Sequence, residues 1–474
     1  MKYDIIVLGA GSAGLNVAVF MNRIGLKVLM VEKHLIGGDC LNYGCVPSKA
    51  LISLSKHMHQ GKKAEQYGVQ IKGSIDLKKI AQTIKKRQDF IREHENEEYF
   101  RKKGIDVKMG SAKFVDKRSI SLNGEVHTAK RIVIATGSRP FTPPIDGVEK
   151  VPYFTNETIF KNEKLPKKFL VVGGGPIGME ISQAYNRLGA EVTIVERNNQ
   201  VLPKEDKEMS NMICEVFKKE GIKLMLGYNP VKFSDKNTLV VSQYDREKRE
   251  NVGKPISIKF DQVIIAIGRR LNIEGLSLEK ANVQVKDNKI VVDKYLRTTN
   301  KHIYVAGDVA GDFLFTHWAE YQASIVINNM VNPRKKSPKR ENVAWVTYVD
   351  PELASFGLQE QNLKEQNIQY EVLELKLDDV DRAIAEGSTE GKLKLFVGKG
   401  KILGGTMLAK NAGELVGELV LAMTLGIPAA KLFERIYPYP TLSRVNKKVI
   451  AKYLGKKLTS KSMSILRILY KILP

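Results

Sequence analysis

Two cysteines near the start of the chain could do redox chemistry. Cys40 and Cys45 are two of only three cysteines among 474 residues. Such a pair, in a chain for which we expect no secretion signal, is typical of a redox-active or metal-binding site rather than of a structural disulfide framework. Five residues of ideal helix rise about 7.5 Å, which exceeds the Cα separation of roughly 7 Å that an unstrained disulfide allows. A bond between the two would need a distorted turn, which Gly44 could supply, and a strained bond is easily reduced.

A metal site and a pair of inert thiols are the alternatives to a redox pair. Zinc would need further ligands, and the nearby His34, His57 and His59 lack the usual paired spacing, so we predict no metal site. Inert buried thiols remain the third interpretation.

A lysine follows the second cysteine at helical spacing. Residues 46–51 are predicted to open a helix, in which Pro47 is tolerated because it lies in the first turn. Lys49 comes four residues after Cys45 and therefore on the same helix face. An ammonium group near a thiol favours the nucleophilic thiolate, whereas the alternative is an ordinary solvated lysine.

A glycine-rich unit occurs twice, each time between a short apolar strand and an apolar helix. The copies contain Gly9, Gly11 and Gly14 with Glu32, and Gly173, Gly175 and Gly178 with Glu196. The same 18 positions separate Gly14 from Glu32 and Gly178 from Glu196. In such units the glycines allow a tight turn, close approach of a pyrophosphate to the helix N-terminus and packing of helix on strand, while the carboxylate binds ribose hydroxyls. Two copies in one frame predict two dinucleotide-binding units, because glycine turns without a ligand would not recur in this way.

The cysteine stretch GGDCLNYGCVPSKAL resembles the redox-disulfide motif of the pyridine nucleotide-disulfide oxidoreductases. That flavoenzyme family includes dihydrolipoamide dehydrogenase, glutathione reductase and mercuric reductase. The resemblance implies that the first glycine unit holds FAD beside a Cys40–Cys45 disulfide and that the second binds the nicotinamide nucleotide. It also implies that Cys45 is the flavin-side thiolate and Cys40 the exchange thiol. Glu196 favours NAD(H) over NADP(H), because a carboxylate would repel the 2′-phosphate.

Other segments resemble later motifs of the same family. Residues 303–309 are similar to its second flavin motif, whose aspartate, here Asp308, contacts the ribityl chain. Glu180 matches the family glutamate that pairs with the motif lysine, and a helix N-terminal carboxylate stabilised by the helix dipole is the alternative. The predicted FAD contacts are Gly9, Gly11, Gly14, Glu32, Lys49, Thr136, Gly137 and Asp308, and the predicted NAD contacts are Gly173, Gly175, Gly178, Glu196 and Gly268.

These motifs predict an α/β protein with two Rossmann-like three-layer nucleotide-binding domains and a C-terminal α+β dimerisation domain. The expected boundaries are 1–150 and 272–337 for FAD, 151–271 for NAD(H), 342–455 for dimerisation and 456–474 for a basic amphipathic tail. Residues 84–103 are predicted to form one long amphipathic helix. The resemblance implies a homodimer in which the dimerisation domain completes the partner's active site.

The chain departs from the family at the proton-transfer element. Relatives that act on dithiols carry His-Pro-Thr followed by glutamate, whereas Tyr439 and Arg444 stand at those two positions, and no histidine follows His317. Tyrosine, with an ordinary pKa near 10, is a poor general base at neutral pH but can donate a proton or guide a substrate. Mercuric reductases also carry tyrosine there, but they end in a cysteine pair, and the last cysteine here is Cys214.

Three functions therefore remain open. The first is dihydrolipoamide dehydrogenase-like exchange with a small dithiol or disulfide, with Cys40, Cys45, Lys49, Glu180 and Tyr439 as the candidate catalytic residues. The second is NAD(P)H-dependent reduction of a quinone, a metal ion or another non-disulfide acceptor. The third is a redox-sensing or interaction protein without turnover.

The charge of the chain is strongly positive. Its 76 basic and 52 acidic residues give a net charge of +24. Nucleic acid, an anionic membrane surface or anionic small molecules could explain this balance. The densest basic run, residues 334–340, contains no aromatic side chain for base stacking, so we predict no nucleic-acid partner.

The C-terminal residues 460–474 form an amphipathic pattern. Ile465, Leu466, Leu469, Ile472 and Leu473 fall on one helical face, with Arg467 and Lys471 on the other. This face is predicted either to pack on its own protein or to contact a membrane surface peripherally. No segment approaches the roughly 20 apolar residues of a spanning helix. We expect a cytoplasmic protein, with peripheral contact to the inner face of the membrane as the second option.

Overall fold

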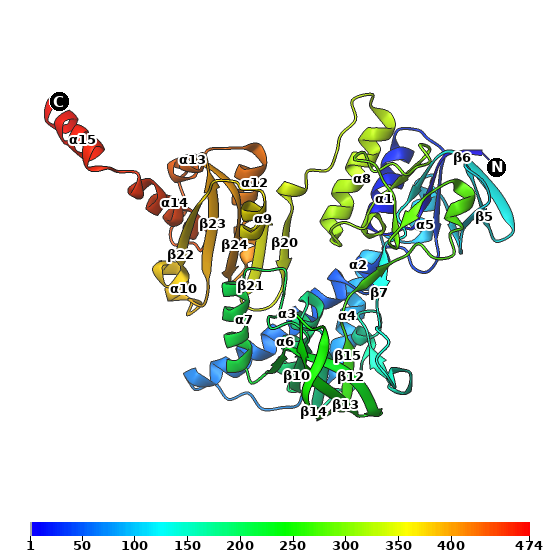
Figure 1. Ribbon diagram of the computed structural model, residues 1–474, viewed down its shortest axis with the longest axis horizontal. Helices are drawn as coiled ribbons and strands as arrows, with labels where there is room; N and C mark the ends of the chain where they lie inside the picture. Colours follow the sequence, from blue (N-terminus) through cyan, green and yellow to red (C-terminus); the bar gives the residue numbers. More distant parts are fainter. Residues whose placement is uncertain (1) are drawn as a thin grey trace. The chain divides into compact units, whose positions relative to one another are not determined.

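The computed structural model describes residues 2–474 and divides into two compact units (Figure 1). The first unit contains residues up to 199 together with 218–338, and the second contains 200–217 together with 339–474. Within the described residues 2–474, no helix combines the length and the apolar character needed to cross a bilayer.

The first unit begins with a seven-stranded sheet in the order β3-β2-β1-β6-β5-β4, with β19 pairing to β6. Its strands are β1 (Lys2–Leu8), β2 (Val28–Glu32), β3 (Asp106–Met109), β4 (Lys113–Phe114), β5 (Ser119–Leu122), β6 (Glu125–Ile134) and β19 (Ile303–Val305). Both faces are buried: Ile5 and Val7 pack against α1 (Ser12–Arg23) and α8 (Thr316–Val331), while Ile6 and Leu8 point into the core on the opposite face. Parallel strands buried on both sides explain why β1 reads as a short apolar run.

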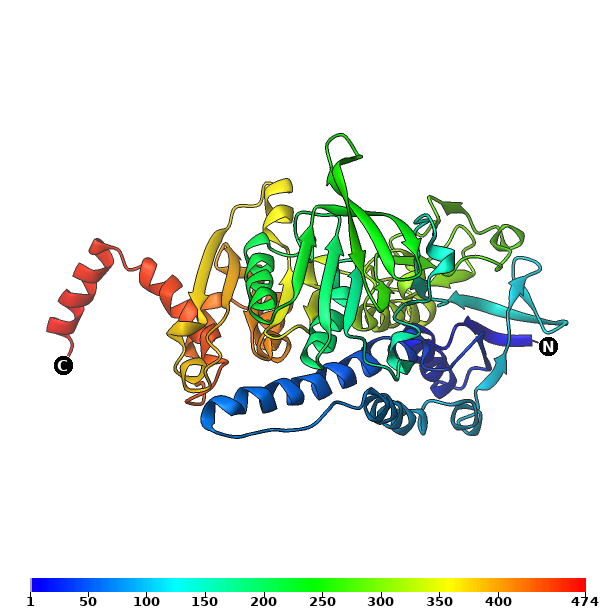
Figure 2. The ribbon, with the colours of Figure 1, turned by 90° about the horizontal axis from the view of Figure 1, so that it is seen from below.

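The cysteine motif and a charged helical region follow β2. They form α2 (Gly38–Asn42), α3 (Cys45–Lys63), α4 (Leu77–Arg92) and α5 (Glu97–Lys102), and α3 is the long blue helix of Figure 2. The prediction of one helix over residues 84–103 is wrong. The chain leaves the helix after Arg92, and Asn96 caps a new one by accepting a hydrogen bond from the Tyr99 amide at 2.9 Å.

The second nucleotide-binding part of this unit repeats the parallel topology. Its five-stranded sheet has the order β11-β10-β9-β15-β8. The strands are β8 (Tyr153–Phe154), β9 (Lys168–Val172), β10 (Glu191–Glu196), β11 (Lys223–Leu226) and β15 (Gln262–Ile265), with helix α6 (Pro176–Arg187) following β9. An antiparallel sheet of β12 (Tyr228–Asp235), β13 (Thr238–Asp245) and β14 (Glu250–Lys259) accompanies it. The short β7 (Ser138–Pro140) and β16 (Arg269–Leu271) pair antiparallel between the two parts, and β17 (Val285–Lys286) pairs with β18 (Lys289–Ile290).

The C-terminal unit is a five-stranded antiparallel sheet in the order β20-β21-β24-β23-β22, with helices. Its strands are β20 (Ala344–Thr347), β21 (Glu352–Gly357), β22 (Glu371–Lys376), β23 (Lys392–Gly398) and β24 (Lys401–Ala409). Its helices are α9 (Glu360–Glu365), α10 (Asp381–Ala385), α11 (Ala412–Leu415), α12 (Gly417–Leu425), α13 (Ala429–Glu434), α14 (Arg444–Lys456) and α15 (Ser460–Ile472). The predicted α/β fold with a C-terminal α+β part is thus confirmed.

One segment joins the C-terminal unit from far away in the sequence. Residues 200–217, which include most of α7 (Lys207–Lys219), lie within the span predicted to bind NAD(H) but group with residues 339–474. The Glu205 carboxylate accepts hydrogen bonds from Trp345 Nε1 at 2.5 Å and Ser355 Oγ at 2.6 Å, and burial raises its pKa. The Lys394 ammonium lies 2.9 Å from Asp206. These polar contacts hold the segment against the sheet.

Candidate active site

The two glycine loops have the same geometry. Gly9 and Gly173 have φ angles of +105° and +115°, and a Cβ at either would lie 2.3 or 2.4 Å from a backbone oxygen of the neighbouring strand. A Cβ at Gly14 or Gly178 would lie 1.9 Å from the carbonyl oxygen of the first glycine of its own loop. Only glycine allows this left-handed turn and this close packing of helix on loop.

The acidic residues at the ends of β2 and β10 also have matching partners. Glu32 accepts hydrogen bonds from the amides of Ala10 and His34, each at 2.7 Å. Glu196 likewise accepts hydrogen bonds from the amides of Gly174 and Asn198, each at 2.7 Å. Each carboxylate keeps further lone pairs for hydroxyl donors, which is what a ribose requires.

Helices α1 and α6 start without a side-chain cap, at Gly11 and Gly175. The backbone amides in the first turn of each helix, apart from Pro176 of α6, which has none, are therefore available to an anionic pyrophosphate at the positive end of the helix dipole. The loops differ in their surroundings. A Cβ at Gly11 would lie 3.6 Å from the Cα of Gly38, whereas one at Gly175 would meet no described atom within 4 Å.

Cys40 lies on α2 and Cys45 is the first residue of α3, and the structure holds both as free thiols. Gly44 joins the two helices with a φ of −118°, so it is not a left-handed turn residue. A Cβ there would lie 2.9 Å from the Asp39 carboxylate and 3.1 Å from the Asp39 carbonyl oxygen, so any larger residue would displace the Asp39 side chain. The tight link brings the two thiols within hydrogen-bonding distance of each other.

The two thiols have opposite pKa shifts. The pKa of Cys45 is lowered to about 6, chiefly by the hydrogen bond from Cys40, with help from the Thr316 hydroxyl and the Lys49 ammonium. The Cys45 Sγ lies 3.3 Å from Thr316 Oγ1, at the first residue of α8. The pKa of Cys40 is raised, first by its hydrogen bond to Cys45 and then by burial. At neutral pH the pair is therefore one thiolate, at Cys45, and one thiol, at Cys40.

The predicted contact between Lys49 and Glu180 is present. The Lys49 ammonium lies 2.9 Å from a Glu180 carboxylate oxygen, and the glutamate side chain is only 7% exposed. This ion pair joins α3 of the first nucleotide-binding part to α6 of the second.

Asp308 belongs to a polar network that the sequence did not reveal. Ser138 Oγ donates to Asp308 at 2.5 Å and accepts from Arg269 Nε at 2.8 Å. The guanidinium of Arg269 also lies 3.2 Å from Asp39, which directly precedes Cys40. Burial raises the pKa of Asp308, and the Ser138 hydrogen bond and the arginine oppose that shift.

The remaining predicted contacts lie where β7 pairs with β16. Thr136 Oγ1 donates to the Asn272 carbonyl at 2.7 Å, and the Asn272 amide donates to the Gly137 carbonyl at 3.0 Å. The carbonyl of Gly268 accepts from the Phe141 amide at 2.9 Å. The hydrogen bonds of these residues therefore stabilise the two chain segments that connect the nucleotide-binding parts.

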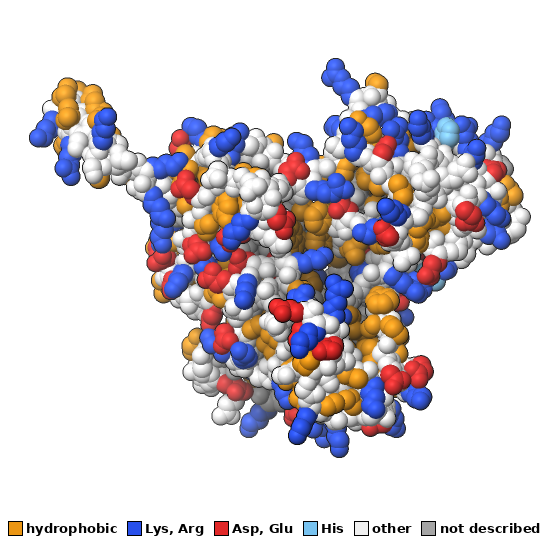
Figure 3. Space-filling model, viewed as in Figure 1, with side chains coloured by type: hydrophobic (Ala, Val, Ile, Leu, Met, Phe, Trp, Pro, Cys, Tyr) orange, Lys and Arg blue, Asp and Glu red, His pale blue; other side chains and the backbone are white. Residues whose placement is uncertain are grey.

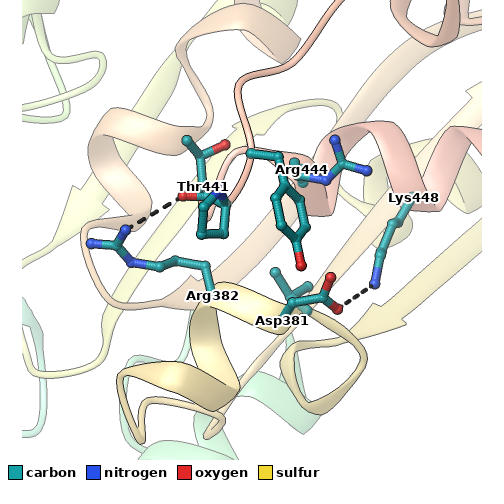
Figure 4. A pocket seen from close by; sticks show the side chains of 8 residues that line it. Asp381, Arg382, Thr441, Arg444 and Lys448 are labelled. Atoms are coloured by element: carbon teal, nitrogen blue, oxygen red, sulfur yellow. Dashed lines mark hydrogen bonds and ion pairs between the residues drawn. The ribbon is translucent and has the colours of Figure 1, made fainter.

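Tyr439 belongs to the C-terminal unit, whereas the other candidates belong to the first. Its side chain is one of eight that line a small pocket (Figure 4), and the others are Val380, Asp381, Arg382, Pro440, Thr441, Arg444 and Lys448. The Asp381 carboxylate receives a hydrogen bond from Lys448 at 3.2 Å and one from the Tyr439 hydroxyl, and both lower its pKa. The guanidinium of Arg444 lies 5.2 Å from the centre of the tyrosine ring. Tyr439 is thus held by a carboxylate and a cation, with 66% of its surface exposed.

Sequence reasoning missed Thr316, Arg269, Ser138 and Asp381. Thr316 lies 271 positions after Cys45, and only folding brings the two together. Among these four residues, Arg269 could have been found from the sequence, because it directly follows Gly268, a predicted NAD contact.

Comparison with known proteins agrees with this geometry. Residues 3–325 match the family described as pyridine nucleotide-disulphide oxidoreductase, and residues 343–449 match its dimerisation domain. The chain is 34% identical to a mercuric reductase of Lysinibacillus sphaericus, over 93% of this chain and 81% of that protein. It is 34% identical to a dihydrolipoyl dehydrogenase of Thermus scotoductus, over 93% and 95%. The solved structure of the HOCl-induced flavoprotein disulfide reductase RclA from Escherichia coli superposes with a TM-score of 0.82 at 26% identity, covering 95% of this chain and 99% of that one.

The structure fits the cofactors of this family. Two glycine cradles that a Cβ would fill, two uncapped helix N-termini and two carboxylates at strand ends suit two dinucleotides. The chain therefore belongs to the pyridine nucleotide-disulphide oxidoreductase family, as an oxidoreductase with FAD and NAD(H) as cofactors and a dimerisation domain that makes it a homodimer.

Proposed function

We propose that the protein is an NADH-dependent disulfide oxidoreductase of the dihydrolipoyl dehydrogenase type, which exchanges electrons with a small disulfide or dithiol through Cys40 and Cys45. The observation that carries this proposal is the unequal thiol pair, in which the pKa of Cys45 is lowered to about 6 and that of Cys40 is raised. The surroundings also favour the thiolate of Cys45, since Thr316 Oγ1 lies 3.3 Å from its sulfur and the Lys49 ammonium lowers its pKa, and disulfide exchange needs one such thiolate and one proton-bearing partner.

The cofactor sites follow from the two glycine loops. We assign FAD to residues 1–150 and 272–337, NAD(H) to residues 151–271 apart from the segment 200–217, which groups with the C-terminal unit, and dimerisation to residues 342–455. The assigned FAD contacts are Gly9, Gly11, Gly14, Glu32, Lys49, Thr136, Gly137 and Asp308, and the assigned NAD(H) contacts are Gly173, Gly175, Gly178, Glu196 and Gly268. Bound FAD supplies the electron pair that NADH delivers and that opens the cysteine disulfide.

The two thiols divide the exchange between them. Because the attacking sulfur must be a thiolate, the Cys40 proton passes to its hydrogen-bonding partner Cys45 as Cys40 attacks one sulfur of the substrate disulfide, which forms a mixed disulfide and releases the first substrate thiolate. Cys45 then attacks the Cys40 sulfur, closes the Cys40–Cys45 bond and gives that proton to the second substrate thiolate as it leaves. The protein loses two electrons and the substrate gains them. Cys40 contributes one of the two protons required, so a second proton must come from another group.

We assign the second proton to Tyr439, in the place where relatives carry histidine. Its hydroxyl donates to the Asp381 carboxylate, so the group is oriented although the usual glutamate is replaced by Arg444. By the family resemblance, Tyr439 of one subunit serves the cysteines of its partner. A phenol is a proton donor rather than a base at neutral pH, which favours turnover in the direction of disulfide reduction.

A second candidate function is reduction of a metal ion or a quinone. Tyr439 and Arg444 in place of the His–Glu pair favour it, as do the relatives named mercuric reductase and a solved Cu(II) complex of the Escherichia coli disulfide reductase. A metal acceptor would approach Cys40 and Cys45 themselves, because the chain has no cysteine after Cys214.

Anaerobic titration of the purified protein with NADH tests the proposal. Long-wavelength absorption from Cys45 thiolate-to-flavin charge transfer is expected after two electrons. Cys40→Ser should show this absorption before NADH is added, because Cys45 cannot form the disulfide in that variant, and Cys45→Ser should not show it at any stage. Lipoamide turnover should be lost in Cys40→Ser and kept in Cys214→Ser, a matched change at the cysteine outside the site. If the flavin simply bleaches, or if Cys40→Ser keeps full turnover with a quinone while the wild type ignores disulfides, the second function replaces the first.

A further inference from the structure

The last helix of the chain exposes its apolar side chains. No residue of α15 is buried, and Tyr470, Ile472 and Leu473 are 86%, 72% and 65% exposed. The other exposed apolar residues of this segment are Met463, Ile465, Leu466, Ile468 and Leu469. The helix extends beyond α14 (Figure 1), and apolar and basic side chains both line its surface (Figure 3). Within the single chain that the structure describes, the apolar face of α15 therefore does not pack on the rest of the chain.

The apolar face covers more than half of the helix circumference. At 100° per residue, the apolar side chains from Met463 to Leu473 cover an arc of roughly 220°. Ser460, Ser464, Arg467 and Lys471 occupy the remaining arc of roughly 140°, whereas Lys461 and Ser462 in the first turn fall within the apolar arc. An apolar face of about 100° or more can pack on a protein core or lie at the boundary between lipid headgroups and acyl chains, so the charge around the helix decides between the two.

The charge around this helix has one sign. Glu434 is the last acidic residue, and all charged side chains after it are basic. They are Arg435, Arg444, Lys447, Lys448, Lys452, Lys456, Lys457, Lys461, Arg467 and Lys471. An anionic lipid surface attracts such a segment, whereas a second copy of the same segment would repel it.

The length of the helix determines how it would meet a bilayer. Its 13 residues span about 20 Å, less than the hydrocarbon thickness of about 30 Å, so it can lie in the surface but not cross it. The match to the dimerisation domain ends at residue 449, before α15 begins. The fold of that domain therefore does not require this helix.

We propose that α15 is an interfacial anchor that binds the surface of an anionic lipid bilayer, with its apolar face among the acyl chains and Arg467 and Lys471 at the headgroups. The cytoplasmic leaflet is the anionic one, so the anchor places the enzyme on the side of the membrane where NADH is available. The proposal does not depend on which acceptor the enzyme reduces.

Flotation of the full-length, FAD-loaded protein with vesicles tests the anchor. At 0.1 M salt the protein should float with vesicles of 30% phosphatidylglycerol in phosphatidylcholine, and binding to pure phosphatidylcholine should be weaker by at least about tenfold. Leu466→Ser with Leu469→Ser should weaken binding by at least about tenfold because it removes apolar contact. Arg467→Gln with Lys471→Gln should weaken binding to the anionic vesicles by about tenfold or more.

A matched control is Val285→Ser with Val331→Ser, two comparably exposed apolar side chains outside the helix. It should float like the wild type, and all variants should oxidise NADH with a soluble dye equally fast without vesicles. Absence of flotation, or equal flotation with both lipids, would overturn the proposal. So would an effect of Leu466→Ser with Leu469→Ser on dimer dissociation in ultracentrifugation without any effect on flotation, because α15 would then bind a second copy of the chain.

Discussion

The two glycine loops of the first unit have the same internal geometry, but different segments of the chain lie beside them. Both have a left-handed first glycine, a third glycine packed on the first, and a carboxylate held by two amides. The start of the cysteine motif lies against the first loop, because a Cβ at Gly38 would lie 2.6 Å from the Cα of Gly11. At Gly175 in the second loop, a Cβ would meet no described atom within 4 Å. The first loop, which lies against the redox motif, thus suits a cofactor that stays bound. The second loop, with open space at Gly175, suits a nucleotide that exchanges.

The largest expected effect on nucleotide binding comes from adding a methyl group to the third glycine of each loop. Gly14→Ala and Gly178→Ala both put a Cβ 1.9 Å from a backbone oxygen, so each should cost about 1–3 kcal/mol of stability or more. We expect Gly14→Ala to purify with little flavin. Gly178→Ala should stay yellow and show a KM for NADH raised by about tenfold or more, because it damages only the exchangeable site. Flavin absorbance per protein and steady-state kinetics measure the two effects.

The control for this pair is Gly25→Ala, because Gly25 is a glycine at which a Cβ would meet no described atom, although its φ of +85° adds some strain. It should lose stability without selective loss of either nucleotide. Loss of flavin from Gly178→Ala and not from Gly14→Ala would reverse the assignment of the two loops.

A smaller effect should follow from changing the two carboxylates. Glu196→Ser removes the anion that would face a 2′-phosphate, so the preference for NADH over NADPH should fall by about tenfold. The neighbouring Arg197 is stacked 5.3 Å from the Tyr244 ring and would then be the nearest cation in sequence. Glu32→Ser is the matched change in the first loop, and it should weaken flavin retention while leaving the ratio of the two nicotinamide nucleotides unchanged. Steady-state kinetics with both nucleotides gives that ratio, and an equal shift in both variants would contradict the comparison.

The features that the sequence predicts correctly are those with a fixed local spacing. The glycine frames, the strands ending in Glu32 and Glu196, and the helix carrying Lys49 all follow from neighbours along the chain. The Lys49–Glu180 contact crosses 131 positions, and only the resemblance to a family made it predictable.

What the sequence could not show depends on long-range polar contacts. Nothing in residues 200–217 indicates that Glu205 is buried against Trp345 in the C-terminal unit. Likewise, Arg269 is an ordinary basic residue after a glycine until folding places it between Asp39 and the Ser138–Asp308 pair. Hydrophobic periodicity carries no information about such partners, because it records the spacing of apolar residues and not the contacts of polar groups.

The ion pair between the two nucleotide-binding parts should have a moderate effect on the thiols. Lys49→Met removes a cation that lowers the pKa of Cys45, so that pKa should rise from about 6. The thiolate is present above this pKa and is lost as the pH falls through it, so alkylation of the reduced protein by iodoacetamide should need a higher pH in the variant. Lys62→Met, at an exposed position of the same helix α3, is the control and should leave the pH profile unchanged. An unchanged profile for Lys49→Met would mean that the lysine pairs with Glu180 without acting on the thiol.

The smallest expected effect tests the contribution of α8 to the same thiolate. Thr316→Val keeps the shape of the side chain but removes the hydroxyl that lies 3.3 Å from the Cys45 sulfur. A single hydrogen bond of this kind contributes about 0.5–1.5 kcal/mol. At pH 6, where about half of Cys45 is thiolate, the alkylation rate should therefore fall by about two- to sevenfold, with nucleotide binding by both glycine loops unchanged. Thr316→Ser retains a hydroxyl and should restore the wild-type rate, which a role of Thr316 in helix packing alone would not predict. If Val and Ser behave alike, the low pKa of Cys45 depends on the Cys40 hydrogen bond and Lys49, which both belong to the motif that closes over the first loop.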